Sequence, residues 1–254
     1  MAEDTDAALA ARLISCLDLT ELGDACTGAD VDRLLDRAVT PAGPVAAVCV
    51  WPRFVARCRD RLAGTGIRIA TVVNFPHGSE HFEDALEETR RAIADGADEI
   101  DMVISRSRIP GEPDFVSRQV AAFVAAAGAH PVKAILESGE MKDDGDVRAA
   151  ARAAIAGGAR FIKTSTGKTP HGASLDAARV MLEEIRASGR PVGLKPSGGV
   201  RTLADGKAYL DLAAGIMGPD WATPQTFRIG ASGILSDLLA HAGAGGEAGA
   251  GEGY

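Results

Sequence analysis

Short runs of apolar and β-branched residues recur along the chain and separate longer stretches with helical spacing. Each run is nearly continuous in hydrophobicity, which is typical of strands buried on both faces of a parallel sheet. The pattern therefore predicts eight strands. They are SCLDLT (15–20), VAAVCV (45–50), IRIATVV (67–73), EIDMVI (99–104), VKAIL (132–136), FIKTST (161–166), VGLK (192–195) and FRIGAS (227–232).

The stretches between these runs are rich in Ala, Glu and Arg and have the spacing of amphipathic helices. The clearest are EDALEETRRAIADGA (83–97), DVRAAARAAIAGGA (146–159) and LDAARVMLEEIRASG (175–189), and each has glycine at or near its end. Glycine in this place indicates the end of a helix. The segment 202–226 is ambiguous, because YLDLAAGIM fits a strand or a helix, and we interpret it as a helix followed by a loop.

Strands that alternate with helices in a chain of 254 residues predict an α/β fold, a (β/α)8 TIM barrel in a single domain. A doubly wound open sheet is the alternative. No linker-like segment divides the interior, so we assign residues 1–242 to the barrel. Residues 243–254 are rich in Gly and Ala and end in Tyr254, and this composition predicts a flexible tail.

Charge and cysteine content narrow the classes of partner. The formal net charge of −8 argues against nucleic acid or an anionic membrane surface and favours a small metabolite. The four cysteines form no CxxC pair and no Cys/His cluster, so the sequence signals neither a metal site nor a disulfide framework. With no signal peptide and no long apolar run, we expect a cytoplasmic protein. Whether it forms a homodimer stays open.

Lys163 is the first candidate for chemistry, because it lies in a run that should be buried, beside Phe161 and Ile162. A buried ammonium is costly unless it is paired or loses its proton. Lys195 ends another buried run, and Lys133 begins a third. Two lysines at one barrel mouth lower each other's pKa, so we predict that Lys163 acts as an amine nucleophile, with Lys195 as the main cause of its lowered pKa. A lysine held in a salt bridge is the alternative.

Two aspartates stand in apolar surroundings. Asp101 is flanked by Ile100 and Met102, and a buried carboxylate there needs a cationic partner, which the lysines supply. Beside an imine-forming lysine it would relay protons through water. Asp18 in CLDLT has the same framing, and we predict a supporting role for it. An Asx turn or a helix cap is the alternative for Asp18.

Three glycine-rich segments follow the last three predicted strands: STGK (165–168), PSGGVR (196–201) and IGASG (229–233). Free backbone N–H groups with Ser hydroxyls and a nearby cation bind phosphate, and barrels commonly bind it after their last strands. We predict that the phosphate contacts are Gly167, Lys168, Gly198, Gly199, Arg201, Gly230 and Ser232. His77 and Cys49 are interpreted first as a structural loop histidine and a small buried strand residue.

The motifs together resemble the deoxyribose-phosphate aldolase family. CLDLT, AAVCVWPRF, RIATVVNFPHG, GADEIDMV, VKAILESGE, FIKTSTGK, VGLKPSGGVRT and FRIGASGIL match it in order and spacing from about residue 13 to residue 240. The resemblance implies reversible cleavage of 2-deoxy-D-ribose 5-phosphate to D-glyceraldehyde 3-phosphate and acetaldehyde, without metal or organic cofactor. A transaldolase-like enzyme and a non-catalytic phosphosugar-binding barrel are the alternatives.

The resemblance also implies roles for single residues. Lys163 is expected to be the Schiff-base lysine, Asp101 the acid/base carboxylate and Lys195 its lysine partner, with Thr166 and Cys49 in support. Family members also end in tyrosine, so Tyr254 is expected to help protonate the enamine. The segment IGASG departs from the pattern, because Gly233 stands where close relatives often carry a second Ser.

Overall fold

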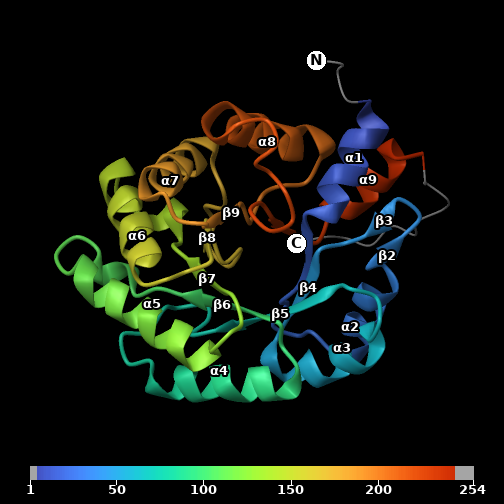
Figure 1. The fold of residues 1–254 in the computed structure, drawn as a ribbon. Helices are drawn as coiled ribbons and strands as arrows, with labels where there is room; N and C mark the ends of the chain where they lie inside the picture. Colours follow the sequence, from blue (N-terminus) through green and yellow to red (C-terminus); the bar gives the residue numbers. More distant parts are fainter. Residues whose placement is uncertain (1–4, 244–254) are drawn as a thin grey trace.

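The computed structural model describes residues 5–243, and residues 1–4 and 244–254 lie outside it. In the described chain, eight parallel strands form one sheet, in the order β10, β1, β4, β5, β6, β7, β8, β9 (Figure 1). The strands are β1 (Leu17–Glu21), β4 (Ala47–Val50), β5 (Arg68–Val73), β6 (Glu99–Val103), β7 (Val132–Ile135), β8 (Phe161–Lys163), β9 (Gly193–Lys195) and β10 (Ile229–Ala231). Each coincides with one of the predicted runs.

The two ends of the sheet meet and close the barrel. The N–H of Arg228 donates to the carbonyl of Leu194 at 3.0 Å, and the N–H of Gly230 donates to the carbonyl of Pro196 at 2.9 Å. These bonds join the chain at β9 to the chain at β10 in parallel. The (β/α)8 barrel is therefore confirmed, and the doubly wound alternative is wrong, because an open sheet would leave these edges unpaired.

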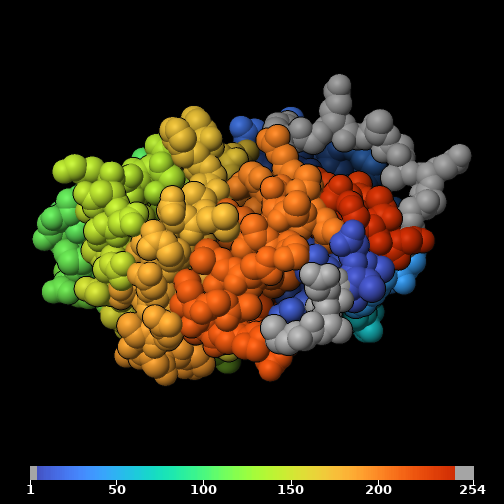
Figure 2. Space-filling model, turned by 90° about the horizontal axis from the view of Figure 1, so that it is seen from above, coloured from blue at the N-terminus to red at the C-terminus, as the bar shows by residue number. Residues whose placement is uncertain are grey.

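A helix follows every barrel strand and covers its outer face. These helices are α2 (Gly28–Asp36), α3 (Val55–Leu62), α4 (Glu83–Asp95), α5 (Pro113–Ala127), α6 (Asp144–Ala156), α7 (Leu175–Ser188), α8 (Leu203–Met217) and α9 (Ile234–His241). Helix α1 (Asp6–Ser15) precedes the barrel and packs against α8 and α9. Figure 2 shows this side of the molecule, where α8 (orange) lies beside α1 (blue) and α9 (red).

The helix ends follow the glycine signals. Gly96 ends α4 with φ of 112°, and Gly189 ends α7 with φ of 62°, a left-handed conformation that glycine adopts without strain. The ambiguous segment forms α8 followed by a loop, as predicted. Its start is fixed by a capping box between Thr202 and Asp205. The sequence pattern did not single out α1, α2 or the short hairpin of β2 (Val39–Thr40) and β3 (Gly43–Pro44).

Side chains alternate strictly along each barrel strand. In β6, Ile100 and Met102 belong to the main apolar core between barrel and helices, whereas Glu99 and Asp101 point to the other face. In β4, Val48 and Val50 face the helices and Cys49 belongs to a second, smaller apolar cluster. This period of two places every charged strand residue of the next section inside the barrel. Among residues 5–243, no helix is both long and apolar enough to cross a bilayer.

Candidate active site

Seven charged side chains meet inside the barrel in the described part of the chain. They come from β1, β6, β7, β8 and β9 and from the residue before β10, and all are buried. We call this set the barrel network. Its members are Asp18, Glu99, Asp101, Lys133, Lys163, Lys195 and Arg228.

Asp101 is the centre of the barrel network, because three lysines share its carboxylate. Lys133 Nζ donates to Oδ1 at 2.7 Å. Lys163 Nζ and Lys195 Nζ both donate to Oδ2, at 2.9 Å and 2.7 Å. Parallel pairing explains the convergence, since Lys133 is the register partner of Asp101, and Lys163 is the register partner of Lys195.

The other half of the barrel network centres on Arg228. Its guanidinium donates to Asp18 Oδ1 at 2.6 Å and to Glu99 Oε1 at 2.9 Å. Asp18 also accepts from Lys195 Nζ at 2.5 Å, and Glu99 Oε2 lies 2.7 Å from Lys133 Nζ. Every carboxylate therefore bridges two or more cations, as buried charges require.

Among these three lysines, Lys163 differs from the others in the direction of its pKa shift. Burial lowers its pKa, Lys195 lowers it further, and Asp101 opposes both. Burial acts on Lys133 and Lys195 in the same direction, yet their carboxylate partners outweigh it and raise both pKa values. The direction predicted for Lys163 is thus found. The predicted main cause is wrong, because desolvation contributes more than Lys195.

The three carboxylates of the barrel network are held as anions. Burial alone would raise their pKa values, but the lysines and Arg228 around them lower the pKa of Asp18, Glu99 and Asp101. At Asp101, Lys133, Lys163 and Lys195 all lower the pKa and together outweigh burial. Asp101 therefore stands beside Lys163 as an ionised hydrogen-bond acceptor.

The predicted supporting residues Cys49 and Thr166 have different surroundings. Cys49 is fully buried, and burial, with Asp101 adding to it, raises the pKa of its thiol, so the thiol is neutral. The N–H of Thr166 donates to Glu137 Oε1 at 3.1 Å, and its hydroxyl accepts the N–H of Lys168 at 3.0 Å, so Thr166 fixes the loop after β8. The hydroxyl of buried Ser165 has no hydrogen-bond partner among the described residues.

The glycine-rich segments after β8, β9 and β10 lie against one another. A Cβ atom on Gly198 would come within 3.6 Å of Gly167 Cα. A Cβ atom on Gly230 would come within 2.7 Å of Ser197 Oγ. Gly167, Gly198 and Gly199 all have positive φ, of 78°, 83° and 85°. The three predicted phosphate loops thus form one surface at the carboxyl ends of the strands, with partly exposed Ser232 before α9 and exposed Arg201 before α8.

Lys168 reaches across the barrel mouth. Its Nζ forms an ion pair of 2.6 Å with Asp24, in the loop after β1, and lies 5.9 Å from the ring centroid of Trp51 after β4. Asp24 is highly exposed, with 90% of its side chain accessible. The contact is therefore a weak surface pair that an anion of higher charge can displace.

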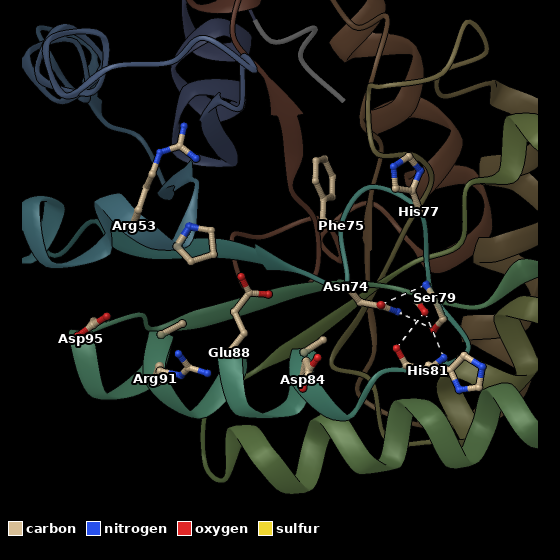
Figure 3. A pocket seen from close by; sticks show the side chains of 13 residues that line it. Arg53, Asn74, Phe75, His77, Ser79, His81, Asp84, Glu88, Arg91 and Asp95 are labelled. Carbon is tan, nitrogen blue, oxygen red and sulfur yellow. Dashed lines mark hydrogen bonds between the residues drawn. The ribbon is translucent and has the colours of Figure 1, made fainter.

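A separate groove lies outside the ends of β4 and β5, against α4 (Figure 3). Its volume is about 630 Å³, and no residue of the barrel network lines it. His77 lies on its rim, but Asn74 holds this loop, bonding to Ser79 and to the carbonyl of Val103. The described residues contain no group of three or more metal-ligating side chains that could hold an ion.

The sequence analysis gave no role to three members of the barrel network, Glu99, Lys133 and Arg228. Lys133 was noted only as the start of a buried run, and the other two also carried a signal. Glu99 has the same strand parity as Asp101, so it had to share the inner face. Arg228 stands between Phe227 and Ile229, as Lys163 stands in its own apolar run. Tyr254 lies outside the described residues.

Sequence and fold are similar to those of known aldolases. A family model described as DeoC/LacD family aldolase matches residues 12–221. A deoxyribose-phosphate aldolase from Agrobacterium fabrum is 51% identical over 234 residues, which cover 91% of this chain and 90% of the relative. The tetrameric deoxyribose phosphate aldolase from Aeropyrum pernix has a TM-score of 0.75 at 25% identity and covers 93% of this chain and 92% of its own. A Toxoplasma gondii structure, provisionally assigned as a deoxyribose-phosphate aldolase, has a TM-score of 0.84 at 24% identity over 96% of this chain and 99% of its own.

Proposed function

Because the chain belongs to the DeoC/LacD family of aldolases, we propose that it reversibly cleaves 2-deoxy-D-ribose 5-phosphate to D-glyceraldehyde 3-phosphate and acetaldehyde through a Schiff base on Lys163. One observation carries the role of this residue. Lys163 is a buried lysine with a lowered pKa, hydrogen-bonded to the ionised carboxylate of Asp101 at 2.9 Å. A neutral amine next to a proton acceptor is what imine chemistry needs.

The first step is condensation. The lone pair of Lys163 Nζ attacks C1 of the open-chain sugar, and the aldehyde oxygen takes up a proton to give a carbinolamine. Loss of water then leaves an iminium ion, which withdraws electrons from C2. Lys195 supports this step because its own ammonium stays charged and disfavours a second charge on Lys163.

The second step breaks the C2–C3 bond. Asp101 accepts the proton of the C3 hydroxyl through a water molecule, and the bonding electrons pass to the iminium nitrogen as an enamine. D-Glyceraldehyde 3-phosphate leaves. Protonation of the enamine carbon and hydrolysis release acetaldehyde and restore the amine of Lys163. Asp18 supports the step by holding Lys195 in place at 2.5 Å.

The substrate phosphate is proposed to bind at the loops after β8, β9 and β10. Their adjacent backbone, with glycines of positive φ at 167, 198 and 199, is suited to direct N–H groups at an anion. Ser232 adds a hydroxyl just before α9, whose N-terminus favours negative charge. Lys168 and Arg201 supply the cations.

The proposal extends to the last residue, the compartment, the partners and the assembly. Tyr254 as the proton donor to the enamine rests on the resemblance. The cytoplasm as the site of action is supported by four unpaired cysteines, of which three are buried. The net charge of −8 argues against nucleic acid or an anionic membrane as a partner, and a small phosphorylated substrate needs only a local positive site. A homodimer is one assembly to test, and the Aeropyrum pernix relative is a tetramer.

Trapping of the intermediate tests the proposed function. Acetaldehyde and borohydride should fix an ethyl group on Lys163, located by peptide mass mapping, and the protein should cleave 2-deoxy-D-ribose 5-phosphate. Lys163→Met should lose both the adduct and the activity while keeping its circular dichroism spectrum. An adduct on Lys195 or Lys168 in the wild-type protein would overturn the assignment. Turnover of ketose phosphates would favour a transaldolase-like enzyme, and tight binding without turnover would favour a non-catalytic barrel.

A further inference from the structure

The barrel network contains four cations but three carboxylates, counted over the residues that the structure describes. The carboxylates are Asp18, Glu99 and Asp101, and the cations are Lys133, Lys163, Lys195 and Arg228. A buried cluster with unequal charge is unfavourable, because the surplus charge lacks a partner and solvent cannot screen it. One cation is therefore expected to give up its proton.

Contacts decide which cation this is. Arg228 keeps its proton at any ordinary pH, so the choice falls on the lysines. Lys133 lies within 2.7 Å of Asp101, 2.7 Å of Glu99 and 3.4 Å of Asp18. Lys195 lies within 2.5 Å of Asp18 and 2.7 Å of Asp101. Lys163 contacts Asp101 at 2.9 Å and no other carboxylate of the barrel network within ion-pair distance.

Arg228 and Glu99 hold this balance from a distance. Arg228 forms ion pairs with Asp18 and Glu99, at 2.6 Å and 2.9 Å, and none with Asp101. Its guanidinium also lies 5.6 Å from the ring centroid of Phe161. Without Arg228, the three carboxylates would face three lysines, and each lysine could stay charged.

We propose that Arg228 and Glu99 are positioning residues that determine, by charge balance, that Lys163 and not Lys133 or Lys195 is the neutral amine of the barrel network. This rests on the proposed Schiff-base role of Lys163. Neither residue touches reacting atoms. The pKa directions in the network agree with the charge count, since Lys163 is lowered while Lys133 and Lys195 are raised.

Two thiols also face these groups and leave the count unchanged. Cys49 lies near Lys163 and Lys195, and burial raises its pKa. Cys16 lies near Arg228 and Asp18, and burial raises its pKa to about 11. Both stay protonated and neutral near pH 7.

The test measures the pH at which imine formation on Lys163 is half-maximal. The full-length enzyme is incubated with acetaldehyde and cyanoborohydride across a pH series, and the ethylated Lys163 peptide is quantified by mass spectrometry. In Arg228→Gln the midpoint should rise by about one pH unit. At a pH below the midpoint, trapping should then be about tenfold slower than in the wild-type protein. The midpoint rises because removing the charge of Arg228 makes a positive charge on Lys163 Nζ less unfavourable and so raises its pKa.

Two further variants separate charge from structure. Arg228→Lys keeps the positive charge but loses the planar guanidinium group, so its midpoint should stay at the wild-type value. Glu99→Gln/Arg228→Gln removes one charge of each sign and should bring the midpoint back toward the wild-type value. A merely structural salt bridge would make all three variants less stable and leave each midpoint in place. Arg152→Gln, which breaks the two-point contact of Arg152 with Glu184 outside the barrel, is the matched control.

The outcomes are decisive in either direction. An unmoved midpoint in Arg228→Gln, or an equal rise in Arg228→Lys, overturns the inference. If Arg228→Gln does not fold, as thermal melting would show, Glu99→Gln takes its place, and its midpoint should fall. An unchanged or higher midpoint there overturns the inference as well. Failure of the proposed function looks different, because wild-type protein would then give no adduct on Lys163 at any pH.

Discussion

Lys163 shows how a single buried side chain carries both reactivity and instability. Its pKa is lowered chiefly because 2% of its side chain is accessible, and Asp101 recovers part of the lost solvation. The unfolded chain holds the same lysine as a hydrated ammonium with a pKa near 10.4. Because this pKa is lower in the folded protein, the folded state binds the proton of Lys163 less tightly than the unfolded chain does, and the difference lowers the free energy of unfolding below about pH 10.4.

Replacing Lys163 by methionine should consequently stabilise the protein. A folded-state pKa below the unfolded value means that the unfolded chain binds more protons, so the wild-type free energy of unfolding rises with pH until about pH 10.4. Lys163→Met removes this dependence and should add on the order of 1 kcal/mol near pH 7, with the gain shrinking toward pH 10. Urea unfolding of both proteins at several pH values measures it. A methionine variant that is less stable than the wild-type protein at pH 7 would contradict this expectation.

Residue-scale prediction from the sequence succeeded where a polar side chain interrupts an apolar run. Lys163, Asp101 and Asp18 were singled out in this way, and the structure brings them together inside the barrel. What the sequence could not supply was the partner of each charge, because Arg228 and Glu99 lie 129 positions apart and meet through barrel closure. Without those partners, the sequence could not show whether burial or Lys195 lowers the pKa of Lys163 more.

At the scale of elements, parallel pairing controls how closely side chains approach. Gly193 on β9 leaves room for its register partner Phe161, since a Cβ atom there would lie 2.3 Å from Phe161 Cε1. Gly230 on β10 does the same for Lys195, whose Cε would lie 3.0 Å from a Cβ atom. Small residues on β9 and β10 therefore create the space that the large inner side chains occupy.

The substitution Gly230→Ala should displace Lys195 and reduce catalysis. The added methyl group would also meet Ser197 Oγ at 2.7 Å, so side chains must move to accept it. We expect kcat to fall by about tenfold or more, because a displacement near 1 Å can cost this much. Gly215→Ala, on the exposed face of α8 with open space around it, is the control and should leave kcat unchanged. Equal kcat values in the two variants would show that Lys195 tolerates the shift.

Elements were predictable where their period was strong. The strands and the helices at 83–97, 146–159 and 175–189 were found from their hydrophobic pattern and glycine ends, whereas the segment of α8 fitted a strand or a helix and was interpreted as a helix. Helix α2 is short, with nine residues and a capping box between Thr27 and Asp30 at its start, so its hydrophobic period extends over few turns. The hairpin of β2 and β3 has two residues in each strand, too few for any period.

At the scale of the whole molecule, the mouth of the barrel is bridged by Lys168 and Asp24, whose loops follow β8 and β1. The two strands are separated in the sheet by β9 and β10, which carry the proposed phosphate loops. The ion pair therefore holds the Lys168 side chain beside the proposed phosphate site. If Lys168 binds the substrate phosphate as proposed, Asp24 and the phosphate compete for the same cation.

Asp24→Asn should accordingly improve binding of the phosphorylated substrate. With its carboxylate partner removed, Lys168 is available to the phosphate, and KM for 2-deoxy-D-ribose 5-phosphate should fall about two- to fivefold, as expected for an exposed pair. KM for unphosphorylated 2-deoxyribose should not change, which steady-state kinetics on both sugars would show. Asp60→Asn, another exposed aspartate in a surface pair, is the control. A parallel fall for both sugars would mean that Asp24 acts on access and not on the phosphate.

The barrel network also affects how the stability of the fold depends on temperature. Hydration of charged groups becomes less favourable on warming, so the penalty for keeping seven ionisable side chains away from water declines as the temperature rises. Apolar burial around the helices behaves differently, because it weakens toward the cold. Both trends act against the folded barrel at low temperature. The buried charges of the barrel network therefore lower the free energy of unfolding more at low temperature than at moderately high temperature.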